Sequence, residues 1–352
     1  MRRLNRYVAR TVWLSILLVL LVIVGIDGLS AFIDESDSRS GTYGFAQIGQ
    51  YVLLTMPRRV YEFIPYAALI GALVGLGQLA STSELVVMRA SGISNGRLAW
   101  MVLKQAMIVA VLGFLLGEYV APAAEQQAQS GRALARYASK QVDTGQGIWR
   151  RDGSVFLHVQ AVAGDNEVFG VTAYEFAADG WMRRAMFADT GRYDGQGWNL
   201  QDVVISEFFE DAVQRSTAAK VVLKSNITPK ILSLENVAPS QLTLVDLIDY
   251  AAFLRTQGED VADFELATWR KLTQPAAVAA LVLMAISFVF GPLRDGTLGF
   301  RIFAGVMVGI LFRLSQDLLG PASLVFGFPP LYAAISPVIA CVRAGLYLLR
   351  KA

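Results

Sequence analysis

Seven charged residues lie within or beside long apolar stretches of the chain. An ionised side chain in such a setting is costly and usually faces a partner or a cavity. Two interpretations remain open. The charges can form interhelical pairs or extend toward water, or Arg58, with Arg132 and Arg136, can bind an anionic head group through guanidinium forks that match phosphate. The seven residues are Asp27, Arg58, Arg59, Glu62, Glu118, Arg313 and Asp317.

The sequence contains no residue pattern typical of catalysis. The phosphate-binding string G-x-x-x-x-G-K-[ST] is absent, so we expect no nucleotide hydrolysis by this chain. The single His, His158, stands in an alternating stretch without a nucleophile or carboxylate at a catalytic spacing, and the single Cys, Cys341, lies in an apolar stretch. One Cys and one His exclude a disulfide framework and multi-ligand metal motifs built on those residues. We therefore predict a chain that is not an enzyme and holds no cofactor or metal of its own.

The elements that position the seven charges are predicted to be membrane-spanning helices. The 352 residues are 54% hydrophobic and only 17% charged, whereas soluble domains are about 25% charged. A helix that crosses the hydrocarbon core needs roughly 20 apolar residues. Six stretches qualify, three before residue 125 and three after residue 267: 11–33, 63–83, 98–122, 272–293, a stretch around 302–312 that takes in Arg313 and Asp317, and 318–342.

Basic residues predict the orientation, because Lys and Arg concentrate on the cytoplasmic side. Six spans place four basic segments on one side, so both termini are expected in the cytoplasm and residues 123–265 outside it. The first span lacks a cleavage site and is too long for a signal peptide. The outer insert carries 13 basic and 20 acidic residues, a net charge of −7, whereas the whole chain carries +2. The basic segments are the N-terminus (Arg2, Arg3, Arg6, Arg10), the loops with Arg89 and Arg97 and with Arg294 and Arg301, and the Arg350–Lys351 end.

The insert changes its hydrophobic period from helical to alternating. Four stretches rich in Val, Phe, Tyr and Thr are separated by Gly- and Asp-containing turns, which predicts an antiparallel sandwich or roll. Helical spacing returns at 243–255. Either the domain is an ordinary globular lobe, or its edge strand pairs with a like domain. The predicted strands are 154–162, 167–176, 181–190 and 197–209.

Two further patterns concern helix contacts. Gly71 and Gly75 form a G-x-x-x-G pair in the second span, which permits close helix approach. Residues 83–92 predict a short amphipathic cytoplasmic helix that ends at Gly92. Glu84 is its one acid among basic neighbours. Such a helix is either merely interfacial or a docking element for a separate ATPase.

These strings together resemble the LptF/LptG family of lipopolysaccharide-export ABC transporter permeases of Gram-negative bacteria. The resemblance covers essentially the whole chain. It is carried by Phe32-Ile-Asp-Glu35, by Leu79-Ala-Ser-Thr-Ser-Glu-Leu-Val-Val-Met-Arg-Ala-Ser-Gly92 and by Phe290-Gly-Pro-Leu-Arg294, with support from Gly117-Glu-Tyr-Val-Ala-Pro122 and Gly147-Ile-Trp-Arg150.

The resemblance implies a half-transporter in the bacterial inner membrane. Its implied partners are the lipid bilayer, a sister LptF-like permease, a dimeric cytoplasmic ATPase that binds ATP and Mg, and a periplasmic bridge of jellyroll proteins, with lipopolysaccharide as cargo and no nucleic acid. The implied domains are 1–122 and 266–352, with three transmembrane helices each, and a periplasmic β-jellyroll with helical connectors at 123–265. Without the resemblance, a membrane scaffold or sensor with a partner-binding β-domain is the alternative.

The resemblance also implies site residues. Where some relatives carry Lys near the end of span one, this chain has Ala31 and then Asp34, Glu35 and Asp37, which directs the head-group contact toward Arg58 or Arg59. Glu84 and Arg89, in a coupling helix at about 82–92, are expected to engage the ATPase. The expected lipopolysaccharide cavity residues are Arg58, Arg59, Phe63, Arg132 and Arg136.

Overall fold

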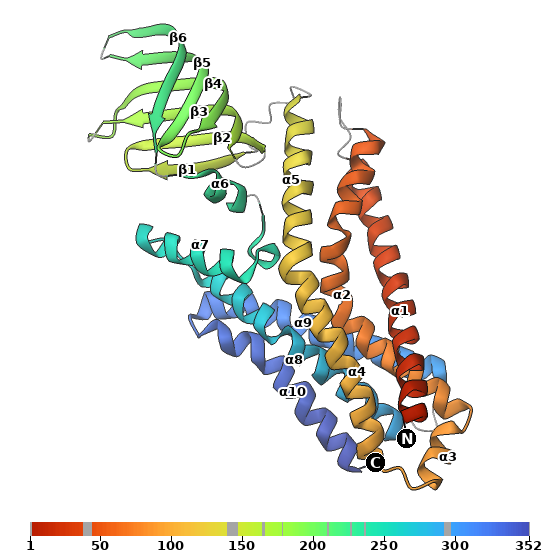
Figure 1. The fold of residues 1–352 in the computed structure, drawn as a ribbon. Coiled ribbons are helices and arrows are strands. Elements are labelled where there is room, and N and C mark those ends of the chain that lie inside the picture. The colour runs from red at the N-terminus through yellow and green to blue at the C-terminus, as the bar shows by residue number, and fades with distance from the viewer. Residues whose placement is uncertain are drawn as a thin grey trace. The chain divides into compact units, whose positions relative to one another are not determined.

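A computed structural model describes residues 2–37, 44–138, 147–163, 166–177, 179–209, 211–225, 227–235, 237–291 and 297–351 (Figure 1). These residues form two compact units. The first comprises Met1–Ser30, Met56–Pro122 and Pro239–Ala352, and its secondary structure is helical. The second comprises Ala31–Thr55 and Ala123–Ala238 and contains a β-sheet. Arg294, which belongs to one of the quoted strings, lies outside the described residues.

Six helical segments are long and apolar enough to cross a membrane, which confirms the prediction of a multi-pass membrane protein. Three segments extend beyond the windows 11–33, 98–122 and 302–312 at both ends, because an apolar window finds only the part of a helix that is free of charge. The predicted span 318–342 is wrong in its first part: residues 318–326 belong to the fifth segment, which ends at Phe326, and the sixth begins at Pro330, after Gly327 in the left-handed conformation (φ 69°). Prolines inside these helices are tolerated because neighbouring groups satisfy the backbone. The segments are α1 (Arg2–Ser36), α2 (Phe45–Ser81), α4 (Asn95–Leu115) continued by η1 and α5, α8 (Ala262–Phe290), α9 (Leu298–Phe326) and α10 (Pro330–Lys351).

The third segment contains a π-helical turn, η1 (Leu116–Val120), followed by α5 (Ala121–Ala138). The apolar stretch 98–122 ends at Pro122, but the helix continues to Ala138. The Ala121 N–H donates to the Leu116 carbonyl, five residues back along the chain. Proline is tolerated in the first turn of a helix, where its missing N–H is not needed. The π turn therefore lets a new helical segment start just before Pro122.

Helices α1 and α2 pack closely at the predicted G-x-x-x-G pair. A Cβ placed on Gly71 would lie 2.5 Å from the Ile16 Cα, and one placed on Gly75 would lie 3.2 Å from the Val12 Cα. Ile16 and Val12 are both buried in the core of the helical unit. The two glycines thus allow backbone to approach backbone, as the motif predicts.

Two shorter helices form where the sequence predicts them, and the second extends two residues beyond the predicted stretch 243–255. Helix α3 (Glu84–Ala90) buries Leu85 and Met88 and is followed by Gly92 at φ 87°. Helix α7 (Leu244–Gln257) begins after Thr243, whose hydroxyl accepts a hydrogen bond from the Asp246 N–H at 3.0 Å. Such capping satisfies a backbone donor that the helix leaves open.

The sheet is a single antiparallel meander in which strands β1 to β6 pair in chain order. Four of its strands match the predicted stretches. The sequence reading missed β1, which contains two arginines in five residues, and β6, whose side chains are mostly exposed. The short, arginine-containing β1 and the mostly exposed β6 each carry too few apolar side chains for a clear alternation in the sequence. The strands are β1 (Ile148–Asp152), β2 (Val155–Ala163), β3 (Glu167–Phe176), β4 (Met182–Tyr193), β5 (Gly197–Phe208) and β6 (Val213–Lys224).

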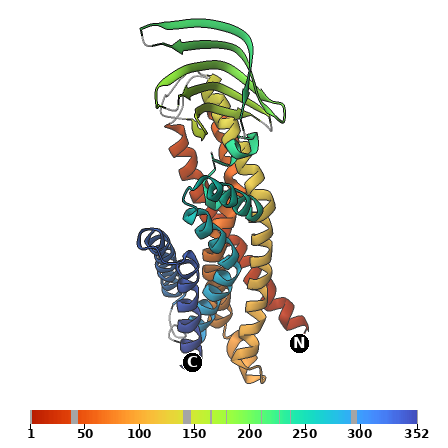
Figure 2. The ribbon, with the colours of Figure 1, turned by 90° about the vertical axis from the view of Figure 1, so that its left-hand side faces the viewer.

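One face of the sheet forms the core of the second unit, and the long strands curve visibly (Figure 2). Trp198 is fully buried there, and its indole N–H donates to the Ile227 carbonyl at 3.0 Å. His158 is buried and packs against the Trp149 ring at 4.5 Å between centroids. Helix α6 (Pro229–Glu235) adds Leu232 to this core.

The turn between β4 and β5 is built around Asp194. Its Oδ1 accepts hydrogen bonds from the Gln196 and Gly197 N–H groups, both at 3.0 Å, and its Oδ2 accepts from the Asn199 amide at 2.7 Å. The bond from Gln196, followed by that from Asn199, lowers the pKa of the Asp194 carboxyl from its ordinary value. This is the Asp-Gly turn that the sequence predicts between two strands.

Substituting Gly71→Ala should weaken the packing of α1 on α2, because the new methyl would meet the Ile16 backbone, which cannot rotate away. Overpacking of this kind costs about 2 kcal/mol. We expect a lower thermal unfolding midpoint of the purified protein. Gly49→Ala, also on α2, meets nothing within 4 Å and serves as the matched control. Equal midpoints for the two variants would contradict the contact.

Candidate functional site

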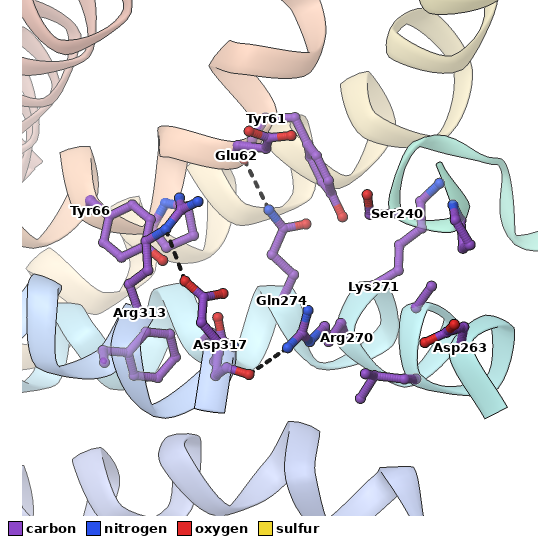
Figure 3. A pocket seen from close by; sticks show the side chains of 17 residues that line it. Tyr61, Glu62, Tyr66, Ser240, Asp263, Arg270, Lys271, Gln274, Arg313 and Asp317 are labelled. Carbon is purple, nitrogen blue, oxygen red and sulfur yellow. Dashed lines mark hydrogen bonds and ion pairs between the residues drawn. The ribbon is translucent and has the colours of Figure 1, made fainter. Parts of the chain in front are cut away.

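A polar cavity of about 490 Å³ lies within the helical unit (Figure 3). Helices α2, α8 and α9 and the short 3-10 turn η2 (Pro239–Gln241) form its walls. Its lining contains equal numbers of acidic and basic side chains, so it carries no net charge. The charged residues are Glu62, Asp263, Arg270, Lys271, Arg313 and Asp317.

Gln274 lies at the centre of this cavity (Figure 3). Its amide nitrogen donates to the Tyr61 carbonyl at 3.0 Å, whereas its buried Oε1 accepts no hydrogen bond within the part of the chain that the structure describes. A buried acceptor without a donor is costly. The cavity is therefore suited to a water molecule or a polar head group that donates to this oxygen.

The two cavity arginines differ in how firmly they are held. Arg270 donates to the Gln316 carbonyl, so one helix of the wall is tied to the next. Arg313 and Asp317 form an i,i+4 pair on α9 at 3.4 Å, with both side chains about half exposed. An exposed pair of this kind contributes little stability and exchanges readily with other ions. The residues that line the cavity can therefore bind and release a polar group. These lining residues include no nucleophile paired with a base.

A buried ion pair joins the third and fourth spans. Lys271 on α8 donates to the Glu118 carboxylate at 2.8 Å, and their side chains are only 4% and 11% exposed. Both partners also bind backbone, because Glu118 accepts from the Leu244 N–H at 2.9 Å and Lys271 donates to the Leu242 carbonyl at 2.7 Å. We call this four-member group the Glu118–Lys271 clamp. It fixes the start of α7 to two membrane helices.

All seven charges singled out in the sequence take part in ion pairs. Arg59 pairs with Asp27 across α1 and α2, and Arg58 pairs with Glu62 at 2.9 Å within α2. Interhelical pairing, the first of the two interpretations, is thus correct for Arg59 and for Glu118. An arginine that pairs with a carboxylate in the resting protein must give up that carboxylate before it binds another anion.

The five predicted cavity residues come from both units of the described structure. Arg58, Arg59 and Phe63 follow one another on α2 in the helical unit, and the Phe63 ring meets Tyr66 edge-on at 6.4 Å. Arg132 belongs to α5 in the second unit, where it pairs with Glu35. The side chain of Arg136 lies outside the described residues.

The sequence reading missed three residues that the cavity depends on: Arg270, Lys271 and Gln274. The apolar window that predicted the fourth span starts at residue 272, directly after Lys271. The rule that a span is free of charge therefore placed Arg270 and Lys271 outside the helix core. Glu118 is an acid within an apolar stretch and therefore requires a cationic partner. A search for that partner could have drawn attention to Lys271.

The predicted coupling residues lie on α3. Glu84 begins this helix, and its carboxylate accepts from the Thr82 hydroxyl at 3.0 Å. Arg89 lies in the last turn. Val86 and Val87 are exposed beside them, while Leu85 and Met88 face inward. The helix thus presents two apolar side chains and an acid at its surface.

Six candidate spans, three of which line a polar cavity, define a multi-pass membrane protein. No group of three or more metal-ligating side chains occurs among the described residues. The sequence profile of the family described as lipopolysaccharide export system permease LptF/LptG matches residues 6–351. The chain belongs to this family, which confirms the resemblance.

Named relatives agree with the assignment. The chain is 36% identical over 352 residues to the lipopolysaccharide export system permease protein LptG of Escherichia coli K12, covering 99% of this chain and 98% of the relative. It is 33% identical over 351 residues to the protein of the same name from Haemophilus influenzae, again with 99% and 98% coverage. Both are named as permease proteins, in agreement with the expectation of a transporter subunit that is not an enzyme.

Glu118→Gln should destabilise the protein, because it leaves the buried Lys271 ammonium without its carboxylate. Removing one partner of a buried pair costs about 3 kcal/mol or more. We expect a marked fall in the thermal unfolding midpoint. Asp317→Asn, which breaks the half-exposed pair on α9, is the matched control and should cost less than about 1 kcal/mol.

Adding Lys271→Met to Glu118→Gln should restore part of the loss, since the double variant buries no uncompensated charge. If Glu118→Gln unfolds at the same temperature as Asp317→Asn, the clamp has no energetic importance.

Proposed function

We propose that this chain is the permease half of an ATP-driven exporter that extracts lipopolysaccharide from the outer leaflet of the bacterial inner membrane. The observation that carries the proposal is the family match along residues 6–351, which includes the membrane helices, the sheet and α3 alike. Lipopolysaccharide transport follows from the family description, and the steps below are our proposal for how this chain contributes.

The cytoplasmic helix α3 is the proposed contact with a dimeric ATPase. Two exposed valines, Val86 and Val87, beside Glu84 offer an apolar surface with one acid, which suits a groove on another protein. Arg89 lies one turn further along. ATP and Mg bind the partner ATPase and not this chain, and a sister permease completes the complex. Nucleotide-driven closure of the ATPase would push α3 and thereby move the membrane helices.

The cargo cavity is proposed to lie between the two permeases, with Arg58, Arg59, Phe63, Arg132 and Arg136 facing the lipid. The carboxylate partners of Arg58, Arg59 and Arg132 keep these guanidinium groups neutralised in the absence of cargo. Acyl chains bind favourably at roughly 0.8 kcal/mol per buried CH₂. Their expulsion therefore requires the energy of ATP, delivered as α1 and α9 close the cavity.

The outer domain, residues 123–265, is proposed to be a jellyroll-type module that passes the lipid to a periplasmic bridge of like folds. Its six strands form an open meander with β1 and β6 at the two edges. The exposed Val213 and Val222 on β6 support edge pairing, because an uncovered apolar edge strand is otherwise prone to aggregation. In this arrangement three spans precede the domain, three follow it, and both termini are cytoplasmic.

Glu84→Ala should uncouple the transporter. We expect purified wild-type chain to bring down a cytoplasmic ATPase and a second permease, and the variant to retain the second permease but lose ATPase binding or lipid-stimulated ATP hydrolysis. Glu84→Gln, which keeps the side chain's size, separates the effect of charge from that of shape. Membrane insertion of all variants should be unchanged.

Two outcomes would contradict this assignment. Full transport by Glu84→Ala would remove Glu84 from the coupling contact. Purification of the wild-type chain without an ATPase or a second permease would favour a membrane scaffold or sensor.

Arg58→Asp should weaken photo-crosslinking of lipopolysaccharide to the cavity, because it replaces a phosphate-binding cation with an anion next to Glu62. The matched control is Arg255→Asp on α7, which removes an exposed arginine that also pairs with a glutamate. Unchanged crosslinking in Arg58→Asp would count against a head-group role for this residue.

A further inference from the structure

We propose that Glu35 is a resident counter-ion of Arg132, and that exchange of this carboxylate for a lipid phosphate makes the site selective for phosphate monoesters over the phosphodiesters of ordinary phospholipids. The inference rests on the proposed function in that it takes a phosphorylated lipid as the cargo. It adds the chemical class of phosphate that the site accepts and the residue that imposes the choice.

The pair is bidentate and largely buried. Arg132 Nε donates to Glu35 Oε1 at 2.7 Å and Nη2 donates to Oε2 at 3.0 Å. The Glu35 side chain is only 10% exposed, and that of Arg132 is 27% exposed. The Arg132 guanidinium also lies over the Tyr51 ring, 5.2 Å from its centroid. This fork is the geometry with which arginine binds phosphate, here occupied by a carboxylate of the same chain.

A small hollow of about 60 Å³ adjoins Arg132. Three glutamines, Gln47, Gln50 and Gln127, are among the residues that line it, together with Tyr51 and Gly131. The volume has room for several waters. Glutamine amides can donate to the oxygens of a phosphate group, so the hollow beside Arg132 is the place where an incoming phosphate would enter.

Charge decides which anions can make the exchange. A phosphodiester carries the same single negative charge as Glu35, so replacing one with the other gains no Coulomb energy and costs the lipid its freedom. A phosphate monoester carries about −1.5 to −2 at pH 7 and binds the arginine more strongly than a carboxylate does. Glu35 belongs to the same chain and is always present beside Arg132, which raises its effective concentration. Only the monoester overcomes this competition.

The neighbouring acids provide a contrast within the same turn of α1. Asp34 is exposed, whereas Glu35 is buried against Arg132. Asp34 therefore has the same negative charge as Glu35 and lies beside it in the chain, but it does not share the contact with Arg132. If general negative charge at the end of α1 repelled phospholipids, removing either acid would have the same effect. If the exchange at Arg132 is responsible, only Glu35 matters.

The test uses the full chain in its assembled complex, reconstituted in nanodiscs of phosphatidylcholine with added phosphatidic acid or phosphatidylglycerol of the same acyl chains. Phosphatidic acid is a monoester and phosphatidylglycerol a monoanionic diester. Lipid retained after detergent extraction is counted by native mass spectrometry. We expect the wild-type complex to prefer phosphatidic acid, and Glu35→Gln to reduce that preference by roughly tenfold through increased retention of phosphatidylglycerol. Asp34→Asn should leave the preference unchanged.

Three results would overturn the proposal. The first two are an unchanged preference for phosphatidic acid in Glu35→Gln, and an equal loss of that preference in Asp34→Asn. The third is loss of both lipids by a well-folded Glu35→Gln, which would make the pair a purely structural contact. Arg132→Gln should abolish the preference, and its persistence there would place the bound lipid elsewhere. If Glu35→Gln fails to fold, Glu35→Asp replaces it: the shorter carboxylate should lower the preference, and an unaltered preference would refute the exchange.

A separate arm adds lipopolysaccharide to the same nanodiscs. Retention of phosphatidic acid with the expected Glu35 dependence, but no retention of lipopolysaccharide, would contradict the proposed function and leave the selectivity intact. Retention of lipopolysaccharide by the wild-type complex, with no effect of Glu35→Gln on the preference for phosphatidic acid, would contradict the selectivity and leave the proposed function intact.

Discussion

A buried ammonium in an apolar helix bundle must have a carboxylate beside it, and this requirement organises the helical unit. Lys271 is almost fully enclosed and meets Glu118, so α8 is held to the π turn of the third span. The same two side chains bind the backbone at Leu242 and Leu244. Because a single unpaired charge here would cost several kcal/mol, the start of α7 and the adjoining parts of two spans form one cooperative group.

Pairing also determines what the protein can do with its charges. Arg58, Arg59 and Arg132 each bind a carboxylate of the same chain, so another anion could bind these residues only by exchange and not by simple capture. Exchange suits a transporter, which must release what it binds. The cavity around Gln274 has as many acidic as basic side chains. Its half-exposed Arg313–Asp317 pair and the Gln274 Oε1 acceptor can accommodate a polar group that carries no net charge.

Local patterns predicted the parts of the fold that depend on local physics. Helix α7 with its Thr243 cap, the Gly92 end of α3 and the close approach at Gly71 appear as the sequence indicates. The failures have equally specific causes. The predicted span 318–342 combined the end of one helix with the start of the next, because the break between Phe326 and Pro330 interrupts no apolar run. Strands β1 and β6 escaped notice because β1 is only five residues long with two arginines and β6 is mostly exposed, so neither shows a clear apolar alternation.

The sequence by itself determined that this is a six-span membrane protein with an alternating, acidic insert and costly charges in its spans, because apolar length and period are properties of neighbouring residues. Only the tertiary structure decided which charges meet. Glu118 and Lys271, or Glu35 and Arg132, are distant in the chain, and no local spacing relates them. Their contact depends on how whole helices pack, and so the clamp, the cavity and the resident counter-ion emerged only from the packed helices.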